Sequence, residues 1–275
     1  FVLFRMEAAL RLGAAAAPLL AAIALAYYHS LPRVRLVRLC DRPWSPSVAL
    51  LAKRLLERSR LEPRECESRI TTRAAENLRR CLAFMADLHA LRAELERQRK
   101  AVDPSDAAHA ALLQRLWLAL LPEESFRARG EAWLRLGFQG ADPCTDFRGM
   151  GGLALRELVH FAEVFREEAL LRCEAWSRDG GAVQALPYAL TAINASAWLW
   201  ALFVDGKLDR CLCVRGASLQ TYRNLFCEML CGFLRLWESE APAGIECFQR
   251  MSNAYIADVR RRLDGSADHI TTLYK

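Results

Sequence analysis

Hydrophobic residues recur at three- and four-residue steps along most of the chain, and this spacing predicts helices that each bury one face. Such stretches are expected over residues 46–61, 71–100, 106–121, 153–176, 186–203, 219–239 and 242–263. The stretch 186–203 is apolar almost all round, which predicts the most buried helix of the protein. The alternation typical of strands does not extend beyond a few positions. The pattern therefore predicts an all-α fold, built as a single multi-helix domain.

The N-terminal region differs, because residues 12–28 carry no charge and are rich in alanine. Four arginines follow this stretch: Arg33, Arg35, Arg38 and Arg42. Three interpretations stay open. The stretch is a signal-anchor or membrane-dipping helix with the arginines on the cytosolic side, or a helix packed against the protein or a partner. The third, a cleaved secretory signal, fits poorly with the acidic Glu7 and with the bulky residues near the end of the stretch.

Composition agrees with a globular helical protein and narrows the classes of function. Of the 275 residues, 53% are hydrophobic and 25% are charged, and glycine (14) and proline (10) are sparse. The formal net charge of +6 is modest, and basic residues alternate with acidic ones. Nucleic-acid binding requires a stripe of basic and aromatic residues, and the sequence contains none, so no nucleic-acid partner is expected.

The ten cysteines do not follow the spacing of a metal site or of a disulfide framework. Two close pairs occur, Cys211 with Cys213 and Cys227 with Cys231, without a CxxC motif and without a histidine nearby. Cys227 and Cys231 are expected to lie in a helix as small apolar side chains. We therefore expect no metal, and reduced thiols in a protein that faces the cytosol.

The segment from Trp133 to Phe161 holds the most informative residue, Arg148, two positions after Asp146 and in front of several glycines. A guanidinium is a planar, always charged fork of donors that matches phosphate oxygens. Glycines permit left-handed torsions and close backbone approach. An arginine inserted into a partner's site accelerates phosphoryl transfer by about 10³–10⁵-fold. On spacing alone the alternative stays open, in which Arg148 pairs with Asp146 and only holds a turn.

This segment resembles, position for position, the signature of the ELMO domain, W-x3-GFQ-x3-P-x-TDFRG-x-G-x3-L-x2-L-x2-F. The matching residues are Trp133, Gly137, Phe138, Gln139, Pro143, Thr145, Asp146, Phe147, Arg148, Gly149, Gly151, Leu155, Leu158 and Phe161. The chain is most similar to the branch of ELMO-domain-containing (ELMOD) proteins that activate GTPases. The resemblance covers residues 65–265 well and the first 64 loosely. It implies an ELMO domain over 46–275 with its core at 65–265, preceded at 1–45 by a hydrophobic helix and basic linker.

In that family the motif arginine is the catalytic finger, and the substrates are small GTPases of the Arf and Arf-like group. The resemblance therefore implies that Arg148 enters the site of a GTP-bound Arf-family partner and stimulates its GTP hydrolysis. No P-loop or nucleotide-binding glycine pattern occurs in the sequence, so no cofactor is expected. The resemblance also implies a place in membrane traffic and a cytoplasmic chain. One expectation is that residues 12–42 make it peripheral to, or anchored at, the cytosolic face of an intracellular membrane. The alternative is a non-catalytic GTPase effector or a membrane-tethered adaptor.

The neighbours of Arg148 are expected to position its loop or to contact the partner. Trp133, Phe138 and Phe147 are expected to pack and stiffen the loop. For two residues the roles stay open: Asp146 orients Arg148 or forms the turn, and Gln139 caps backbone groups or positions a water. The remaining residues of this kind are Gly137, Pro143, Thr145, Gly149 and Gly151. Asn194, in the apolar helix, is expected to bond to a loop or to a second helix.

Overall fold

The computed structural model describes residues 69–178, 185–265 and 270. Backbone contacts divide the chain into two units, Phe1–Leu91 and Arg92–Lys275. Helix α5, Arg69–Gln98, begins in the first unit and ends in the second. The hydrophobic helix expected within residues 1–45 lies outside the described residues. In the part of the chain that is described, no helix combines the length and apolar character needed to cross a bilayer.

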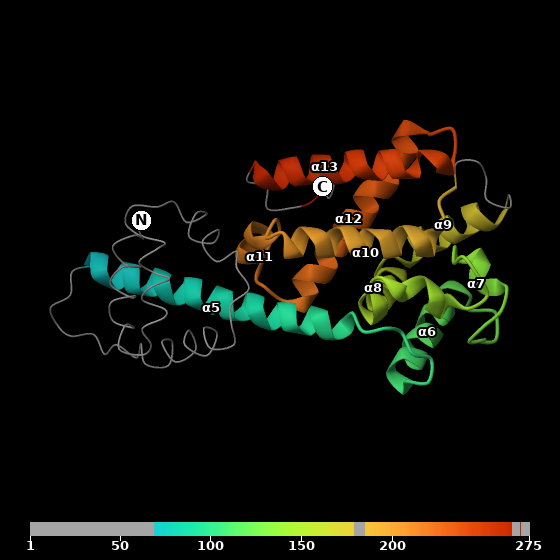
Figure 1. Ribbon diagram of the computed structural model, residues 1–275, viewed down its shortest axis with the longest axis horizontal. Coiled ribbons are helices and arrows are strands. Elements are labelled where there is room, and N and C mark those ends of the chain that lie inside the picture. The colour runs from blue at the N-terminus through green and yellow to red at the C-terminus, as the bar shows by residue number, and fades with distance from the viewer. Residues whose placement is uncertain (1–68, 179–184, 266–269, 271–275) are drawn as a thin grey trace. The chain divides into compact units, whose positions relative to one another are not determined.

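Every regular element of the described residues is a helix, so the all-α prediction is confirmed for this part of the chain (Figure 1). After α5 come α6 (Ala107–Leu120), α7 (Ala132–Arg135), α8 (Gly151–Val164), α9 (Arg166–Arg178), α10 (Tyr188–Val204), α11 (Asp209–Arg215), α12 (Leu219–Glu240) and α13 (Phe248–Asp264). Two 3-10 helices, η2 (Pro143–Arg148) and η3 (Ile245–Cys247), precede α8 and α13.

Helix α10 is the central element of the second unit, as its apolar sequence predicts. It packs against α8 and α12, while α8 also packs on α6 and α12 on α13. In Figure 1, α10 lies between α13 on one side and α8 with α6 on the other. Ala195, Ser196 and Leu199 in the middle of α10 are fully buried. Helix α10 also contacts η2, so the segment around Arg148 packs on this helix.

The prediction of one continuous helix over 153–176 is wrong, because the structure has two helices there, separated at Phe165. Phe165 leaves helical torsions (φ −117°, ψ 48°), and its ring stacks on that of Phe161 with centroids 5.1 Å apart. The next residue, Arg166, donates from Nε to the carbonyl of Ala119 at 3.1 Å, near the C-terminal end of α6. No glycine or proline marks this break, so packing between helices, and not local propensity, decides it.

Two connections expected to be irregular contain short helices. The segment between α6 and α8 includes α7 and η2. The connection after α10, which lies outside the expected helices, holds α11. The start of α6 follows the prediction, since Asp106 caps it by accepting from the backbone N–H groups of Ala108 and His109.

Candidate functional site

A chain of buried aromatic rings lies beneath the segment that carries Arg148. Trp117 of α6 packs edge-on against Trp133, Trp133 against Phe138, and Phe138 against Phe147, with centroids 5.1, 5.3 and 5.7 Å apart. The relative exposures of Trp133, Phe138 and Phe147 are 0%, 3% and 1%. These side chains pack inside the domain, as expected for residues that stiffen a loop. That they position a catalytic group stays a prediction.

Gly137 brings this segment against the start of α10. Its φ of +87° lies in the left-handed region, and a Cβ there would be 2.5 Å from the backbone nitrogen of Tyr188. The carbonyls of Leu136 and Gly137 accept from the N–H groups of Ala189 and Leu190 at 3.0 and 3.3 Å. Two carbonyls of the signature segment thus satisfy two of the N–H groups at the N-terminus of α10 that have no partner within the helix.

Two aspartates hold the turn that leads to Arg148. Asp142 caps η2 by accepting from the backbone N–H of Cys144 at 3.0 Å, with Pro143 at the first helical position. Asp146 Oδ2 accepts from the backbone N–H of Gln139 at 2.8 Å. Asp146 therefore joins the two ends of the loop and forms the turn. The Gln139 side chain is exposed.

Arg148 is the last residue of η2 and is exposed to solvent. Its Nε donates to the carbonyl of Thr145, one helical turn earlier, at 2.7 Å. Within the described part of the chain, its two terminal nitrogens form no ion pair, and Asp146 bonds elsewhere. The expected pairing of Arg148 with Asp146 is therefore wrong for these residues, while Arg148 does contact its own turn through the Thr145 carbonyl. The guanidinium is thus hydrogen-bonded at Nε, and its two terminal nitrogens form no ion pair with an acid among the described residues.

Gly149 and Gly151, which follow Arg148, differ in backbone torsion and in the space around them. Gly151 has φ +57°, and a Cβ there would lie 2.1 Å from the carbonyl oxygen of Lys100, so close approach requires glycine. Gly149 has an ordinary helical φ of −83°, and a Cβ there would meet no atom within 4 Å. The expectation of a special torsion holds for Gly151 and is wrong for Gly149. The absence of a side chain at Gly149 leaves the space beside Arg148 open.

A buried carboxyl group that the sequence did not single out lies in α8. Glu157 is fully buried, and burial raises the pKa of its carboxyl to about 8, against smaller opposing effects of Ser196 and Arg223. Neither Glu157 oxygen is in hydrogen-bonding geometry with a described residue. From the sequence, Glu157 looks like a charge next to the apolar stripe of its helix. Only its neighbours from α10 and α12 show that the position is closed to water.

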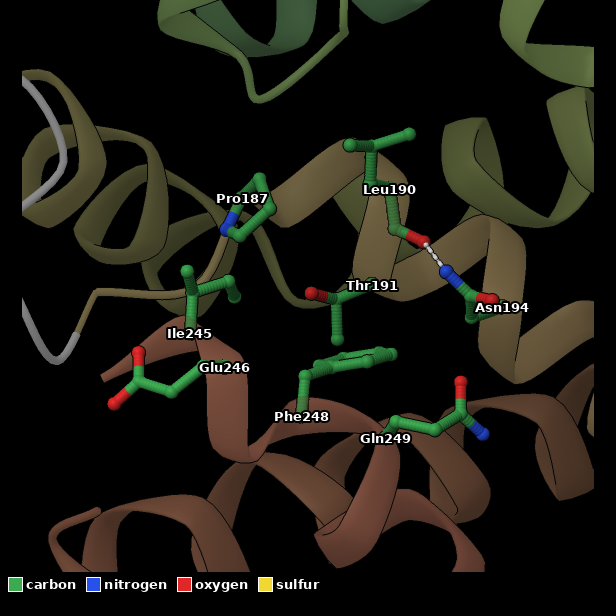
Figure 2. A pocket seen from close by; sticks show the side chains of 8 residues that line it. All are labelled: Pro187, Leu190, Thr191, Asn194, Ile245, Glu246, Phe248 and Gln249. Carbon is green, nitrogen blue, oxygen red and sulfur yellow. Dashed lines mark hydrogen bonds between the residues drawn. The ribbon is translucent and has the colours of Figure 1, made fainter. Parts of the chain in front are cut away.

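A pocket of about 290 Å³ lies between the start of α10 and the η3–α13 corner. Figure 2 shows the ring of Phe248 below Thr191, with Pro187 and Ile245 to one side and Asn194 to the other. The lining offers the Glu246 carboxylate and the amides of Asn194 and Gln249 among apolar groups. This pocket suits an apolar group more than phosphate.

The side chain of Asn194 bonds within its own helix. Asn194 Nδ2 donates to the carbonyl of Leu190 in α10 at 2.8 Å, so the expected bond to a loop or second helix is wrong.

The cysteines and acidic groups of the described residues form no metal centre. No group of three or more His, Cys, Asp or Glu side chains that could bind a metal ion occurs in this part of the chain. Cys227 and Cys231 of α12 are not joined in a disulfide, and their relative exposures are 4% and 7%. Burial raises the pKa of the Cys227 thiol far above its usual value. Both cysteines thus behave as the small apolar residues that the sequence predicts.

The family comparisons cover the whole of this site. The model of the ELMO/CED-12 family matches residues 93–252. ELMO domain-containing protein 2 of Mus musculus is 32% identical, with 68% of this chain and 64% of that protein aligned. ELMO domain-containing protein B of Dictyostelium discoideum is 30% identical, over 68% of this chain and 66% of that protein.

A third relative is ELMO domain-containing protein 1 of Bos taurus, 27% identical over 68% of this chain and 63% of that protein. The chain spans just under two thirds of the length of these relatives. No solved structure matches the chain. The matched range contains the chain of aromatic rings from Trp117 to Phe147, the carbonyls of Leu136 and Gly137 that cap α10, the 3-10 helix with Arg148 and the glycine contact to Lys100. With more than half of its length matched by that model, the chain belongs to the ELMO/CED-12 family.

Proposed function

We propose that this chain activates GTP hydrolysis by a small GTPase of the Arf and Arf-like group, and that Arg148 is its arginine finger. The similarity of the signature to the GTPase-activating branch of ELMO-domain proteins supports this assignment. The observation that carries it is the state of Arg148, which is exposed and held through Nε by the Thr145 carbonyl at 2.7 Å.

This geometry suits a group that acts on a partner. A hydrogen bond at Nε restricts the stem of the side chain, so less conformational freedom is lost when the guanidinium meets its target. The two terminal nitrogens stay available for a bidentate contact with phosphate oxygens. The open space at Gly149 allows another surface to come close to Arg148.

In the proposed reaction the partner GTPase holds GTP and its magnesium ion, and water attacks the terminal phosphate. Negative charge on the transferring phosphoryl group and on the leaving oxygen is stabilised by the Arg148 guanidinium. A finger supplied in this way accelerates the reaction by about 10³–10⁵-fold. The chain itself moves no proton and forms no covalent bond; it supplies a positioned charge.

Single-turnover GTP hydrolysis by a panel of Arf and Arf-like GTPases, with this chain and its Arg148→Lys variant, tests the proposal. Lysine keeps the charge but cannot make the bidentate contact, so we expect acceleration to fall by about 10³-fold or more. The matched control is Arg261→Lys, at an exposed arginine of α13, which should retain full activity. Both variants should unfold at the same temperature as the wild type.

Two outcomes would contradict the proposal. An Arg148→Lys variant as active as the wild type would remove Arg148 from the role of finger. Binding of the wild-type chain to a GTP-bound GTPase, with no change in its hydrolysis rate, would favour the effector or adaptor function instead. Catalytic amounts of the chain should deplete GTP on an excess of partner only if it is an activator.

We also propose that residues 12–42 place the chain at the cytosolic face of an intracellular membrane. The uncharged stretch followed by arginines supports this, through burial of apolar side chains and attraction to anionic lipid headgroups. Co-sedimentation of the chain with anionic vesicles should decrease when the four arginines of residues 33–42 are replaced by glutamine. Equal sedimentation of both proteins would contradict electrostatic attachment.

A further inference from the structure

The end of α5 lies against the loop that carries Arg148. The backbone N–H of Gly152 donates to the carbonyl of Lys100 at 2.8 Å. A Cβ at Gly151 would lie 2.3 Å from the carbonyl oxygen of Arg99. The backbone after α5 therefore fixes the C-terminal side of this loop, through a contact between segments about 50 residues apart.

The side chain of Arg99 connects the same loop to α10. Its guanidinium carbon lies 4.5 Å from the centroid of the Trp200 ring. One terminal nitrogen, Nη2, donates to the carbonyl of Gly149 at 3.4 Å. Arg99 thus lies between a large aromatic side chain of the central helix and the residue directly after Arg148.

An arginine is specifically suited to this place. Its planar guanidinium can stack on the Trp200 face and donate from its edge at the same time, which a lysine ammonium cannot do. Arg99 is half-buried, and its Nε is buried without a hydrogen-bond partner among the described residues. Packing against Trp200 therefore sets the position of the group more than hydrogen bonding does.

The hydrogen bond from Arg99 to the Gly149 carbonyl is long in the free chain. At 3.4 Å it exceeds the usual range of about 2.7–3.2 Å for an N–H···O bond, so it adds little to the stability of the free chain. Hydrogen bonds in catalytic sites are often long in the free protein and tighten in the reacting complex. Its contribution should therefore appear in the rate of the reaction more than in folding.

We propose that Arg99 is a positioning residue for Arg148, an inference that rests on the proposed function of Arg148 as a finger. Arg99 does not touch the GTPase's nucleotide in this role. Stacked on Trp200, it restrains the Gly149 peptide and thereby the backbone from which the Arg148 side chain extends. The restraint lowers the ordering needed when Arg148 reaches the transition state, so it acts on the maximal rate and not on association.

The test is single-turnover GTP hydrolysis at increasing concentrations of the full chain carrying Arg99→Met, which keeps the length of the stem but not the guanidinium. We expect the maximal rate to fall about tenfold, a change of about 1.4 kcal/mol in activation free energy. The concentration that gives half of that rate should change by less than about twofold. The matched control is Arg97→Met, at an exposed arginine two residues earlier in the last turn of α5 that pairs with Glu94, and it should leave both parameters unchanged.

A binding measurement separates positioning from a structural role. Arg99→Met should weaken binding to the GTPase that carries GDP and aluminium fluoride, a transition-state mimic, by about tenfold, and leave binding to a non-hydrolysable GTP form unchanged. A variant that merely disturbs the fold would weaken both and unfold at a lower temperature. Trp200→Leu, which removes the stacking surface, should lower the maximal rate in the same direction by about threefold.

The outcomes distinguish this inference from the function on which it rests. If Arg148→Lys loses acceleration while Arg99→Met and Trp200→Leu keep the wild-type rate, the inference is overturned and the proposed function stands. If Arg148→Lys keeps its acceleration, or if no GTPase is accelerated, the proposed function fails and the inference fails with it. Should Arg99→Met unfold, Arg99→Lys decides, because it keeps the charge and loses the planar face; a wild-type maximal rate would overturn the inference.

Discussion

Polar side chains are hydrogen-bonded in the loop that carries Arg148 and lack such bonds in the interface between α8, α10 and α12. In the loop, the carboxylates of Asp142 and Asp146 both accept from backbone N–H groups. In the interface, Glu157, Ser196 and Tyr222 are fully buried. Ser196 lies close enough to Glu157 to lower the pKa of its carboxyl, but none of the three side chains makes a hydrogen bond of good geometry with a described residue.

The difference shows how each region keeps its shape. Hydrogen bonds over short sequence distances keep the exposed loop in one conformation, so Arg148 can be both accessible and positioned. The interface is held by apolar packing, and each buried polar group without a partner costs about 1–3 kcal/mol of stability. Polar groups therefore stabilise the loop and weaken the interior. Three sets of variants, in order of decreasing effect, would sharpen or break this comparison.

The largest effect is expected at Gly151, where the loop meets the backbone after α5. Gly151→Ala should lower the free energy of unfolding by about 4 kcal/mol or more, because its φ is +57° and the new methyl would overlap the carbonyl of Lys100. The matched variant Gly149→Ala should change it by less than about 0.5 kcal/mol, since the space there is open. Urea denaturation measures both. Equal effects at the two glycines would contradict the described contact.

The next effect concerns Glu157 and depends on pH. Burial raises the pKa of its carboxyl from 4.5 to about 8. The folded chain keeps a proton that the unfolded chain has released, so stability falls as pH rises from about 4.5 to about 8 and then levels off. Glu157→Gln should therefore raise the free energy of unfolding at pH 8 by roughly 4 kcal/mol and have little effect near pH 4.5.

Urea denaturation of wild type and Glu157→Gln at both pH values checks this expectation. Glutamine has nearly the shape of the protonated carboxyl, so packing should be retained. The same difference in stability at the two pH values would show that the Glu157 carboxyl does not titrate in this range.

The smallest effect is expected at Asp146. Asp146→Asn keeps an oxygen that can accept from Gln139 but removes the negative charge, which weakens the bond. We expect the free energy of unfolding to fall by about 1 kcal/mol. Asp205→Asn, at a surface carboxylate paired with Arg260, is the control and should change it by less than about 0.5 kcal/mol. An effect of Asp146→Asn no larger than that of the control would mean that its bond does not hold the loop.

Much of the fold and part of the site could be predicted from the sequence, because they depend on neighbours within a few residues. The three- and four-residue spacing of apolar side chains predicts the helices, and a capping residue such as Asp106 marks a helix start. The signature segment identifies Arg148. Its large aromatic side chains are predicted to be buried, and they are. The torsion of Gly151 follows from the same segment, whereas the ordinary torsion of Gly149 does not.

Only the tertiary structure shows which distant groups meet. The break at Phe165 follows from contacts of α9 with α6, and no local signal marks it. The burial of Glu157 depends on α10 and α12 covering one position of α8, and this raises its pKa. Arg99 looks like any other charge at the end of a long helix until Trp200 and Gly149 are brought beside it. Local propensity and periodicity carry no information about such contacts, because helix packing alone brings these residues together.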